Sequence, residues 1–427
     1  MTTKDVLVVG GGIAGMTAAL ELSRLGYRVH LVERNPSIGG NLAKLSRLFP
    51  TLDDAREVLV SRIADVAKAS KINLLTYSEV QSISGKPGDF KVEVFMRPRG
   101  VNVAKCTACG KCVEVCPISV PNEFEEGLTN RKAIYIPFRE AYPRAYTIDF
   151  SVCIRCGECV KICPEGAVDL ADEAKLLSLH VGAIIIATGY QLYDARKLEV
   201  YGYGLYENVI TSMQLERMLS QHGPTGGRVK RVDGVDAKKV AILHCAGSRD
   251  RNYVSYCSRI CCMYILKQAY LLRQQGVDVT LYYMDVRANY RGGEDFYAKV
   301  QEAGISFIRG KVAEITKGDG GKLVIVAEDT LSGGTLLLKD EYDVVVLATP
   351  MIPSAGLKDI AEKIGVLLDV DGFVAPRHLK TDPVSTSIEG VFACGCALGP
   401  KDVGESVSEA LAAALKTSFF LKEDNAQ

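Results

Sequence analysis

Residues 5–15 read DVLVVGGGIAG, an apolar run that leads directly into a glycine-rich turn. The run predicts a short buried strand, and the following MTAALELSRLG (16–26) has the apolar spacing of a helix. Gly10, Gly12 and Gly15 match the pattern G-x-G-x-x-G. Such glycines permit a tight turn, let the backbone approach a pyrophosphate and allow the helix to pack closely on the strand. The stretch therefore predicts an α/β domain that binds a dinucleotide.

Three later segments extend this site. RVHLVE (28–33) predicts a second strand that ends on Glu33, where an acid binds a ribose hydroxyl. GAIIIATG (182–189) and SIEGVFACGC (387–396) predict strands that run into turns of small residues. The set resembles flavoproteins of the disulfide-reductase type, which have two dinucleotide-binding domains and bind FAD. The expected FAD contacts are Gly10, Gly12, Gly15, Glu33, Arg34, Gly39, Gly40, Thr188, Gly189, Gly395 and Cys396.

One position departs from that flavoprotein pattern. The last segment usually ends in Gly-Asp, and the acid binds the ribityl chain. Here Gly395 is followed by Cys396, so that hydrogen bond must be replaced or lost. The alternative interpretation of this segment is a core strand without a ligand.

A doubled cysteine pattern lies between these segments. CTACGKCVEVCP (106–117) and CIRCGECVKICP (153–164) both have the spacing C-x2-C-x2-C-x3-C-P. In such a pair, three cysteines of one run and the fourth of the other hold each [4Fe–4S] cluster. We assign one cluster to Cys106, Cys109, Cys112 and Cys163, and the other to Cys153, Cys156, Cys159 and Cys116. The alternatives are structural zinc, which has no use for the third cysteine or the proline, and a disulfide knot.

A second group of cysteines follows the strand KKVAILH (238–244). The next residues are CAGSRD rather than a glycine loop, so we expect a dinucleotide-type domain that has lost nicotinamide binding. The group comprises Cys245, Cys257, Cys261 and Cys262. A third [4Fe–4S] cluster, a redox-active disulfide and buried free thiols are the competing interpretations. We favour the cluster, although adjacent residues seldom both reach one cube.

Together these segments predict an α/β fold and resemble a flavoprotein of the thioredoxin-reductase type, which implies two dinucleotide-binding domains, here with an inserted two-cluster ferredoxin domain. The expected parts are 1–100, 176–237 and 346–427 for the FAD-binding domain, 101–175 for the ferredoxin domain, and 238–345 for the degenerate NAD(P)-type domain. The aromatic spacer between the cysteine runs should wrap the clusters. The last residues, KEDNAQ, are expected to be disordered.

Composition narrows the class of protein further. Lys plus Arg and Asp plus Glu each number 51, so the net charge is zero and no nucleic-acid surface is indicated. Fourteen cysteines indicate metal or redox work in a reducing compartment, so we expect a cytoplasmic protein. No apolar run is long enough for a membrane span.

Further motifs extend the resemblance over almost the whole chain. SIGGNLAKLSRLFPTLD (37–53), VPNEFEEGL (120–128), the CAGSRD and YCSRICCMY segments, and GPKD (399–402) resemble the A-type subunit of heterodisulfide reductase, HdrA. The resemblance implies an FAD-containing electron hub in a multi-subunit complex, with a dimer as one arrangement. It implies B- and C-type subunits, ferredoxin, and hydrogenase- or dehydrogenase-type donors as partners. It also implies that the four later cysteines ligate a cluster.

Two departures from that family are visible. Longer members carry an additional N-terminal domain and a C-terminal ferredoxin domain that this sequence lacks. They also have cysteines after FPTLD, where this chain has Asp53–Asp54–Ala55–Arg56. The cluster that those cysteines help to bind is therefore expected to be absent.

The predicted function is electron transfer between FAD and [4Fe–4S] clusters, with bifurcation or confurcation of electron pairs at the flavin. Lys401 in GPKD is the candidate for a cation beside the isoalloxazine, the alternative being a solvated loop lysine. The rival functions are a protein like the membrane-associated quinone-linked relatives, an NAD(P)H:ferredoxin oxidoreductase, and a redox sensor or scaffold. The five histidines have no metal-ligand spacing.

Overall fold

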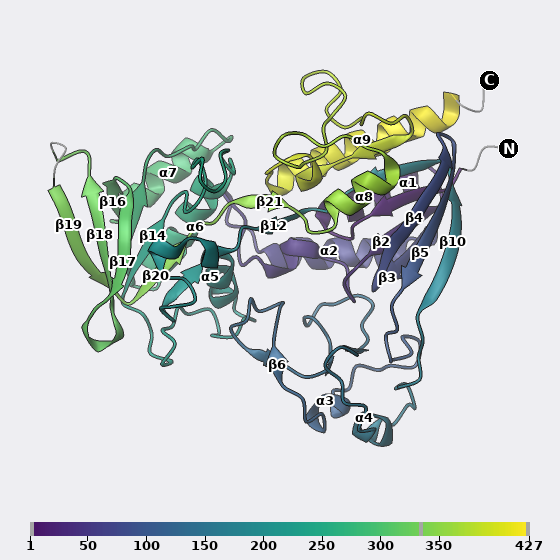
Figure 1. Cartoon of the computed structure of the whole chain (residues 1–427), viewed down its shortest axis with the longest axis horizontal. Helices are drawn as coiled ribbons and strands as arrows, with labels where there is room; N and C mark the ends of the chain where they lie inside the picture. The colour runs from purple at the N-terminus through teal and green to yellow at the C-terminus, as the bar shows by residue number, and fades with distance from the viewer. Residues whose placement is uncertain (1–3, 333–335, 424–427) are drawn as a thin grey trace. The chain divides into compact units, whose positions relative to one another are not determined.

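The computed structural model describes residues 4–332 and 336–423, and the chain divides into two compact units (Figure 1). Unit 1 comprises Met1–Ala43, Arg56–Gln191 and Pro353–Gln427, and unit 2 comprises Lys44–Ala55 and Leu192–Ile352. Disorder was expected for KEDNAQ, residues 422–427. Lys422 and Glu423 instead form the end of helix α9 (Val403–Glu423), and 424–427 lie outside the described residues.

Unit 1 is built on a parallel sheet with the strand order β22-β11-β1-β2-β3. The strands are β1 (Val6–Val9), β2 (Val29–Glu33), β3 (Ile72–Thr76), β11 (Ala183–Ile186) and β22 (Val391–Ala393). Their apolar runs are largely buried, as expected of parallel strands covered on both faces. The accompanying helices are α1 (Ile13–Arg24), α2 (Ala55–Lys68), α8 (Leu357–Ile364) and α9 (Val403–Glu423), of which α1 and α9 pack together. The strand order changes direction between β1 and β11, so a ligand is expected at the carboxyl ends of these strands.

A smaller antiparallel sheet of unit 1 carries the cysteine-rich insertion. It has the order β10-β5-β4, from β4 (Ser78–Lys86), β5 (Asp89–Met96) and β10 (Lys175–Val181). The insertion, residues 97–174, connects the paired strands β5 and β10. It contains α3 (Lys111–Glu114), β6 (Val120–Pro121), β7 (Asn130–Arg131), β8 (Ile134–Tyr135), β9 (Thr147–Ile148) and α4 (Glu158–Ile162). It has an apolar core of its own, including Ile134, Ile148 and Val168.

Unit 2 repeats much of this order of elements, with its edge strand at the beginning of the unit rather than at its end. Its parallel sheet has the order β13-β20-β14-β15-β16, and its antiparallel sheet has the order β17-β18-β19. The strands are β13 (Val209–Thr211), β14 (Lys239–Leu243), β15 (Asp278–Tyr283), β16 (Ser306–Arg309), β17 (Val312–Lys317), β18 (Leu323–Asp329), β19 (Leu336–Tyr342) and β20 (Val344–Leu347). The helices are α5 (Ser212–Leu219), α6 (Cys261–Gln274) and α7 (Gly293–Glu302). The α/β fold expected from the sequence, two dinucleotide-type domains with a ferredoxin insertion, is thus confirmed.

The boundary between the units differs from the expected one. Residues 192–237 belong to unit 2 rather than to the FAD-binding part, because β13 pairs with β20 in the second parallel sheet. The segment Lys44–Ala55 also belongs to unit 2. No local sequence pattern marks either assignment to unit 2, since both depend on contacts between residues far apart in the chain.

A buried ion pair anchors that segment within unit 2. Lys267 Nζ on α6 lies 2.6 Å from Glu216 Oε1 on α5, with 2% and 4% of the two side chains exposed. Glu216 Oε2 accepts hydrogen bonds from Ser46 N (2.9 Å) and Ser46 Oγ (2.7 Å). Lys267 Nζ also donates to the carbonyl oxygen of Arg47 at 2.8 Å. The attraction of Lys267 keeps the pKa of Glu216 below its ordinary value despite the burial, which would raise it.

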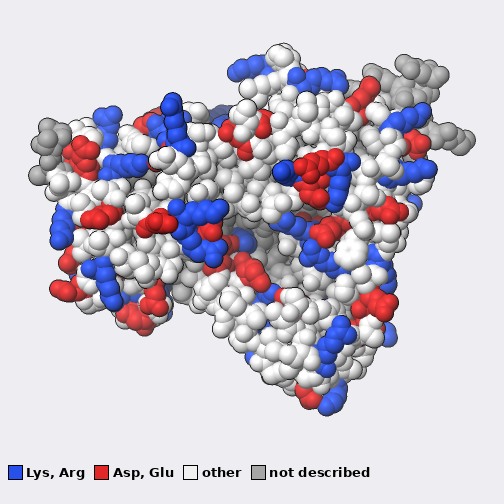
Figure 2. All heavy atoms as spheres, in the orientation of Figure 1, with Lys and Arg blue, Asp and Glu red and all other residues white. Residues whose placement is uncertain are grey.

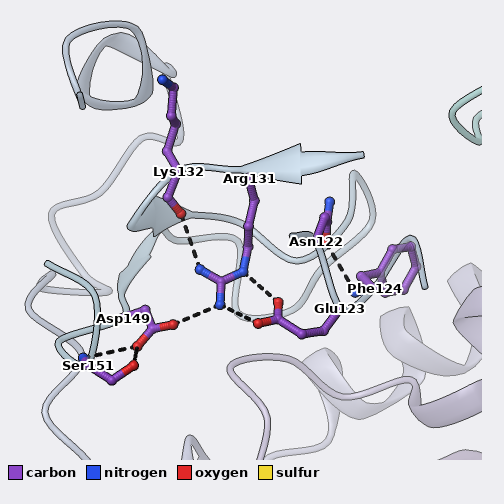
Figure 3. A network of polar contacts seen from close by, with 7 residues as sticks. All are labelled: Asn122, Glu123, Phe124, Arg131, Lys132, Asp149 and Ser151. Carbon is purple, nitrogen blue, oxygen red and sulfur yellow. Dashed lines mark hydrogen bonds and ion pairs between the residues drawn. The ribbon is translucent and has the colours of Figure 1, made fainter. Parts of the chain in front are cut away.

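A second polar network orders the spacer between the two cysteine runs (Figure 3). The guanidinium of Arg131 donates two hydrogen bonds to Glu123, at 2.6 and 2.7 Å, and a third to Asp149 Oδ2 at 2.8 Å. Arg131 also stacks over Tyr135, 4.1 Å from its ring centroid. Because the Asp149 carbonyl accepts from Cys153 N, the network fixes the start of the second cysteine run.

Figure 2 shows basic and acidic side chains interspersed over the face drawn, in keeping with the zero net charge. In the described part of the chain, no helix combines the length and hydropathy needed to cross a membrane.

Candidate cofactor sites

The glycine-rich turn after β1 leaves backbone groups uncovered. Gly12 is the N-cap of α1 and no side chain caps this helix end, so its first N–H groups are available to an anion. A Cβ at Gly12 would have only the Cα of Gly40 within 4 Å, at 3.9 Å. By contrast, a Cβ at Gly10 would collide with Ala187 and one at Gly15 with Gly10. Gly12 therefore faces open space that a pyrophosphate could fill, whereas Gly10 and Gly15 are required by close packing of the protein itself.

Glu33 closes one side of this turn from the end of β2. Its carboxylate accepts hydrogen bonds from Gly11 N at 2.7 Å and from the backbone and side-chain nitrogens of Asn35, both at 2.8 Å. Burial raises the pKa of Glu33 above its ordinary value. A carboxylate has about four lone-pair sites, so acceptor capacity remains for a ribose hydroxyl. Arg34, the next residue, is exposed and lies beside Gly356.

Two other strand ends reach the same edge of the sheet. Thr188 follows β11, and its hydroxyl oxygen is buried without a hydrogen-bond partner. Gly189 has a positive φ of 71°, and a Cβ there would meet no atom within 4 Å. Gly395 follows β22, and a Cβ there would lie 2.9 Å from the Cβ of Ala14 in the first turn of α1. An unpaired buried hydroxyl beside bare backbone is consistent with a missing polar ligand, so these residues fit a dinucleotide.

A residue that the sequence analysis did not single out also contributes to this edge. Glu409 Oε2 on α9 accepts a hydrogen bond from Gly395 N at 3.0 Å. Its Oε1 lies 3.3 Å from Lys401 Nζ, and only 12% of the Lys401 side chain is exposed. Cys396, at the position of the usual Asp, donates instead to the Lys401 carbonyl at 3.5 Å. A carboxylate thus reaches this turn from a helix, and no sequence motif marks it.

The doubled cysteine runs form two hollows, each with about 340 Å³ of empty space including open solvent. The first is lined by Cys106, Cys109, Cys112 and Cys163, and the second by Cys116, Cys153, Cys156 and Cys159. Each hollow therefore combines three sulfurs of one run with the fourth of the other. Apolar side chains complete both walls, among them Val168 in the first and Ile134 in the second. Such thiolate sets in apolar surroundings fit [4Fe–4S] clusters.

The two runs have matching local conformations. Ala108 and Arg155 have positive φ angles of 53° and 54° at the same position of each run. The glycines that cap α3 and α4, Gly110 and Gly157, have φ angles of 88° and 82°. These left-handed residues turn the chain so that three sulfurs face one point. All fourteen cysteines lie among the described residues, and none forms a disulfide.

Burial in these hollows acts on the thiols themselves. It raises the pKa of Cys112 to about 12 and raises that of Cys159. Both thiols must lose a proton to become iron ligands, which couples cluster binding to proton release. Arg155 N and Ala167 N donate to the sulfurs of Cys153 (3.4 Å) and Cys163 (3.3 Å). These two backbone N–H groups therefore already point at sulfurs that we expect to bind iron.

The third set of cysteines meets at the carboxyl end of β14 in unit 2. Cys245 follows this strand with a φ of 54°, and Cys261 and Cys262 open α6. The four thiols shift one another's pKa values, with Cys261 acting on the other three. Interaction with Cys261 lowers the pKa of Cys245, lowers that of Cys257 to about 6 and that of Cys262 to about 4, while the pKa of Cys261 itself is raised. The adjacent pair Cys261–Cys262 therefore reaches one site together with the other two sulfurs.

Several polar groups surround these four sulfurs. Arg259 N donates to Cys257 Sγ at 3.3 Å, and Cys262 Sγ lies 3.8 Å from the Asp285 carbonyl. Arg249 pairs with Asp285 at 2.7 Å. His244 is 8% exposed, and both of its ring nitrogens are buried without a hydrogen-bond partner. Such outer contacts typically tune the potential of a cluster.

The turn after β14 differs from the glycine-rich turn after β1. Gly247 is its one glycine, with a φ of 85°. A Cβ at Gly247 would lie 2.9 Å from the Leu198 side chain, so this glycine packs against protein. The glycine loop that binds a pyrophosphate has no counterpart here.

Comparison with known families supports both halves of unit 1. Residues 5–71 match the family described as FAD dependent oxidoreductase, and residues 105–168 match the 4Fe-4S dicluster domain. The chain is 45% identical over 418 residues to the A-type subunit of the H(2):CoB-CoM heterodisulfide,ferredoxin reductase of Methanothermobacter marburgensis, covering 97% of this chain and 63% of that protein. It is 47% identical over 425 residues to an A-type iron-sulfur subunit of the CoB--CoM heterodisulfide reductase of Methanopyrus kandleri, covering 98% and 64%. The chain thus spans a little less than two thirds of the length of these relatives.

Among solved structures, the chain resembles thioredoxin reductases in fold. The enzyme from T. acidophilum aligns with a TM-score of 0.55 and 18% identity over 99% of this chain and 100% of that chain. The enzyme from Lactococcus lactis aligns with a TM-score of 0.54 and 17% identity over 98% and 99%. At this identity, the likeness shows the fold, with its two dinucleotide-type domains, and nothing about substrates.

Proposed function

We propose that the chain is an FAD- and iron–sulfur-containing electron-transfer subunit of a heterodisulfide-reductase-like complex, since it is 45% and 47% identical to A-type subunits of heterodisulfide reductases. The observation that carries the proposal is the insertion of two four-cysteine hollows between β5 and β10 of the unit that bears the dinucleotide turn. One compact unit would thereby hold both kinds of redox group. When bound, FAD supplies two-electron chemistry and the clusters one-electron chemistry, which is what bifurcation or confurcation requires.

Different residues of unit 1 would hold different parts of the FAD and the clusters. Gly12 and the free N–H groups of α1 would receive the pyrophosphate, and Glu33 would accept from the ribose. We propose Lys401, held by Glu409 next to the turn after β22, as the cation beside the isoalloxazine. The eight cysteines of the insertion would ligate two clusters in the sets that line the hollows.

In unit 2, we propose that the four cysteines at the carboxyl end of β14 ligate a third [4Fe–4S] cluster. The position of Cys245 just after β14, with Cys261 and Cys262 at the start of the following helix α6, supports this assignment. Partner subunits of the B and C type and low-potential donors such as ferredoxin belong to the same proposal, because the relatives are named as subunits of heterodisulfide reductases.

The test is anaerobic purification from the native host with iron and flavin quantified and copurifying subunits identified. We expect about twelve irons and about one FAD per chain, from three four-iron clusters, and copurifying subunits. A protein without iron would contradict the proposal. Reduction of the purified flavin by NADH or NADPH alone would instead favour the NAD(P)H:ferredoxin oxidoreductase alternative.

A further inference from the structure

The loop that follows β2, residues 36–40, faces the glycine-rich turn after β1. A Cβ at Gly12 would have the Cα of Gly40 as its one neighbour within 4 Å, at 3.9 Å. On the same side, Gly39 N donates a hydrogen bond to the carbonyl oxygen of Gly11 at 2.8 Å. The position of this loop therefore sets the width of the space that we assign to the pyrophosphate.

The middle of the loop is buried, and its polar groups find partners in the ferredoxin insertion (97–174). Ser37 is 4% exposed and Ile38 is fully buried. Ile38 N donates to the carbonyl oxygen of Tyr142 at 3.1 Å, and Ser37 Oγ accepts from Tyr142 N at 2.9 Å. Ser37 Oγ also donates to the carbonyl oxygen of Ile38 at 2.8 Å. A buried backbone group without a partner is costly, so the buried conformation of the loop depends on Tyr142.

Two further residues of the insertion contact the same loop. Arg99 Nη2 donates to the carbonyl oxygen of Pro36 at 2.8 Å. A Cβ at Gly39 would lie 3.3 Å from Cζ of Phe138, so this aromatic ring lies against bare backbone. The ring of Phe138 is itself stacked on that of Phe124, with the centroids 4.9 Å apart. Three separate positions of the insertion thus hold the loop on the side away from the turn.

The part of the insertion that contacts the loop, residues 138–142, is also fixed to a helix of unit 1. Glu140 Oε1 accepts from Arg56 Nε at 2.6 Å, and Arg56 lies in the first turn of α2. The side chain of Glu140 is only 16% exposed. Residues 138–142 therefore have a defined position relative to α2 as well as to the loop, which lets them restrain the loop rather than move with it.

We propose that residues 138–142 of the insertion are a positioning element of the FAD site, which holds the loop 36–40 opposite the glycine-rich turn. This inference rests on the proposed function, because it requires FAD at that turn. Tyr142 and Phe138 act through the loop. The affinity for FAD then depends on the folded insertion as well as on the parallel sheet.

The test is equilibrium dialysis of the anaerobically purified protein, with released FAD measured by its fluorescence. Ser37→Ala removes the oxygen that accepts from Tyr142 N. Because a buried donor then lacks a partner unless the loop shifts, we expect the dissociation constant of FAD to rise about tenfold. The visible circular dichroism of the bound flavin should change, and the iron content should not. Ser37→Thr, which keeps the hydroxyl, should restore most of the affinity.

The matched control is Ser418→Ala. Ser418 is also buried in unit 1, and its Oγ lies 3.1 Å from the hydroxyl of Tyr27. Tyr27 precedes β2 at the amino end of the strand, whereas the loop follows the carboxyl end. The control should therefore retain the wild-type affinity for FAD.

Phe138→Leu is the second variant if Ser37→Ala fails to fold, and it should weaken FAD binding at full iron content. Unchanged affinity for FAD in both variants would overturn the proposal. An equal loss of affinity in Ser418→Ala would also overturn it, as would a parallel loss of iron and FAD in the loop variants, because the contacts would then serve general stability. Wild-type protein that binds no FAD would instead contradict the proposed function itself.

Discussion

The two units share a series of elements around two different turns. In both, a central parallel strand is followed by a helix, two further parallel strands, a three-stranded antiparallel sheet and one strand that returns to the parallel sheet. The remaining edge strand comes last in unit 1, as β22, but first in unit 2, as β13. After β1 the chain continues with Gly10–Gly11–Gly12, and α1 begins at Ile13. After β14 it continues with His244–Cys245–Ala246, and α6 begins only at Cys261.

This comparison shows that the fold sets where a site lies, whereas the residues of the turn set which ligand the site can bind. The topology places a site at the carboxyl ends of β1 and β11 in unit 1, and of β14 and β20 in unit 2. The residues of the turn then select the ligand. Bare glycines leave backbone N–H groups for phosphate, whereas cysteines fill the same place with sulfur ligands.

The antiparallel sheets of the two units share one strand order but differ in the length of one connection. The connection between β18 and β19 spans residues 330–335, whereas the matching connection between β5 and β10 spans 97–174 and contains the ferredoxin insertion. Adjacent antiparallel strands have neighbouring ends, so a compact domain can be inserted there without disturbing the pairing.

Gly12→Ala should break the site of unit 1 with the largest effect. Gly12 has ordinary extended angles (φ −76°, ψ −174°), and a Cβ there meets only the Cα of Gly40 at 3.9 Å. The protein should fold normally, but the methyl group would occupy the space of the pyrophosphate. We expect at least a tenfold loss of FAD, measured as flavin absorbance per protein, with unchanged iron content. Full flavin content would show that Gly12 does not face the phosphates.

Cys257→Ala should remove the site of unit 2 alone. We expect iron to fall from about twelve to about eight atoms per chain while FAD is retained, because one four-iron cluster is lost. Iron analysis and flavin absorbance measure both quantities. Cys394→Ala is the control, since Cys394 is fully buried outside the three sets and its loss should not change the iron content. Equal iron in Cys257→Ala and wild type would return the four thiols to a disulfide or core role.

Lys267→Met tests the buried ion pair that joins helices α5 and α6 of unit 2. In unit 1, by contrast, helices α1 and α9 pack through small apolar residues. The substitution leaves Glu216 buried without its cation and should destabilise the protein by about 3–5 kcal/mol. Chemical unfolding measures the change. Adding Glu216→Gln should recover part of the loss, since the unpaired charge is removed.

The same pair predicts a pH dependence. The folded pKa of Glu216 lies below its ordinary value. The stability that ionised Glu216 contributes to the fold is therefore complete above the ordinary pKa, and it is lost as the pH falls through the folded pKa. Acid unfolding of Glu216→Gln should lack this component. An unchanged acid profile would contradict the assignment.

Lys401→Ala should have the smallest effect. Loss of a cation near the flavin should lower its two-electron potential by about 30 mV, or tenfold in the equilibrium constant. Glu409→Gln is the matched control, because it removes the negative partner of Lys401 and should shift the potential the other way. Potentials that do not move in either variant would leave Lys401 with only the structural role of its ion pair with Glu409.

Local sequence patterns predicted most of the candidate cofactor-binding residues. The spacing of the cysteine runs set their pairing into two groups, because each run can present only three sulfurs to one point. The glycines after β1 and the acid at the end of β2 likewise act within one βαβ unit. The fold class followed from the same motifs, and the structure and its thioredoxin-reductase neighbours confirm it.

Features that depend on contacts between distant residues were decided by the tertiary structure alone. Residues 192–237 and 44–55 join unit 2 through β13 pairing with β20 and through the buried pair Lys267–Glu216. Glu409 reaches Gly395 from a helix, and Arg99 spans from the insertion to the ends of β2 and β3. None of these residues has a motif, because a charge buried by tertiary packing has the same local sequence as an exposed one. Sequence spacing determined which ligands are present, and chain packing determined which charges surround them.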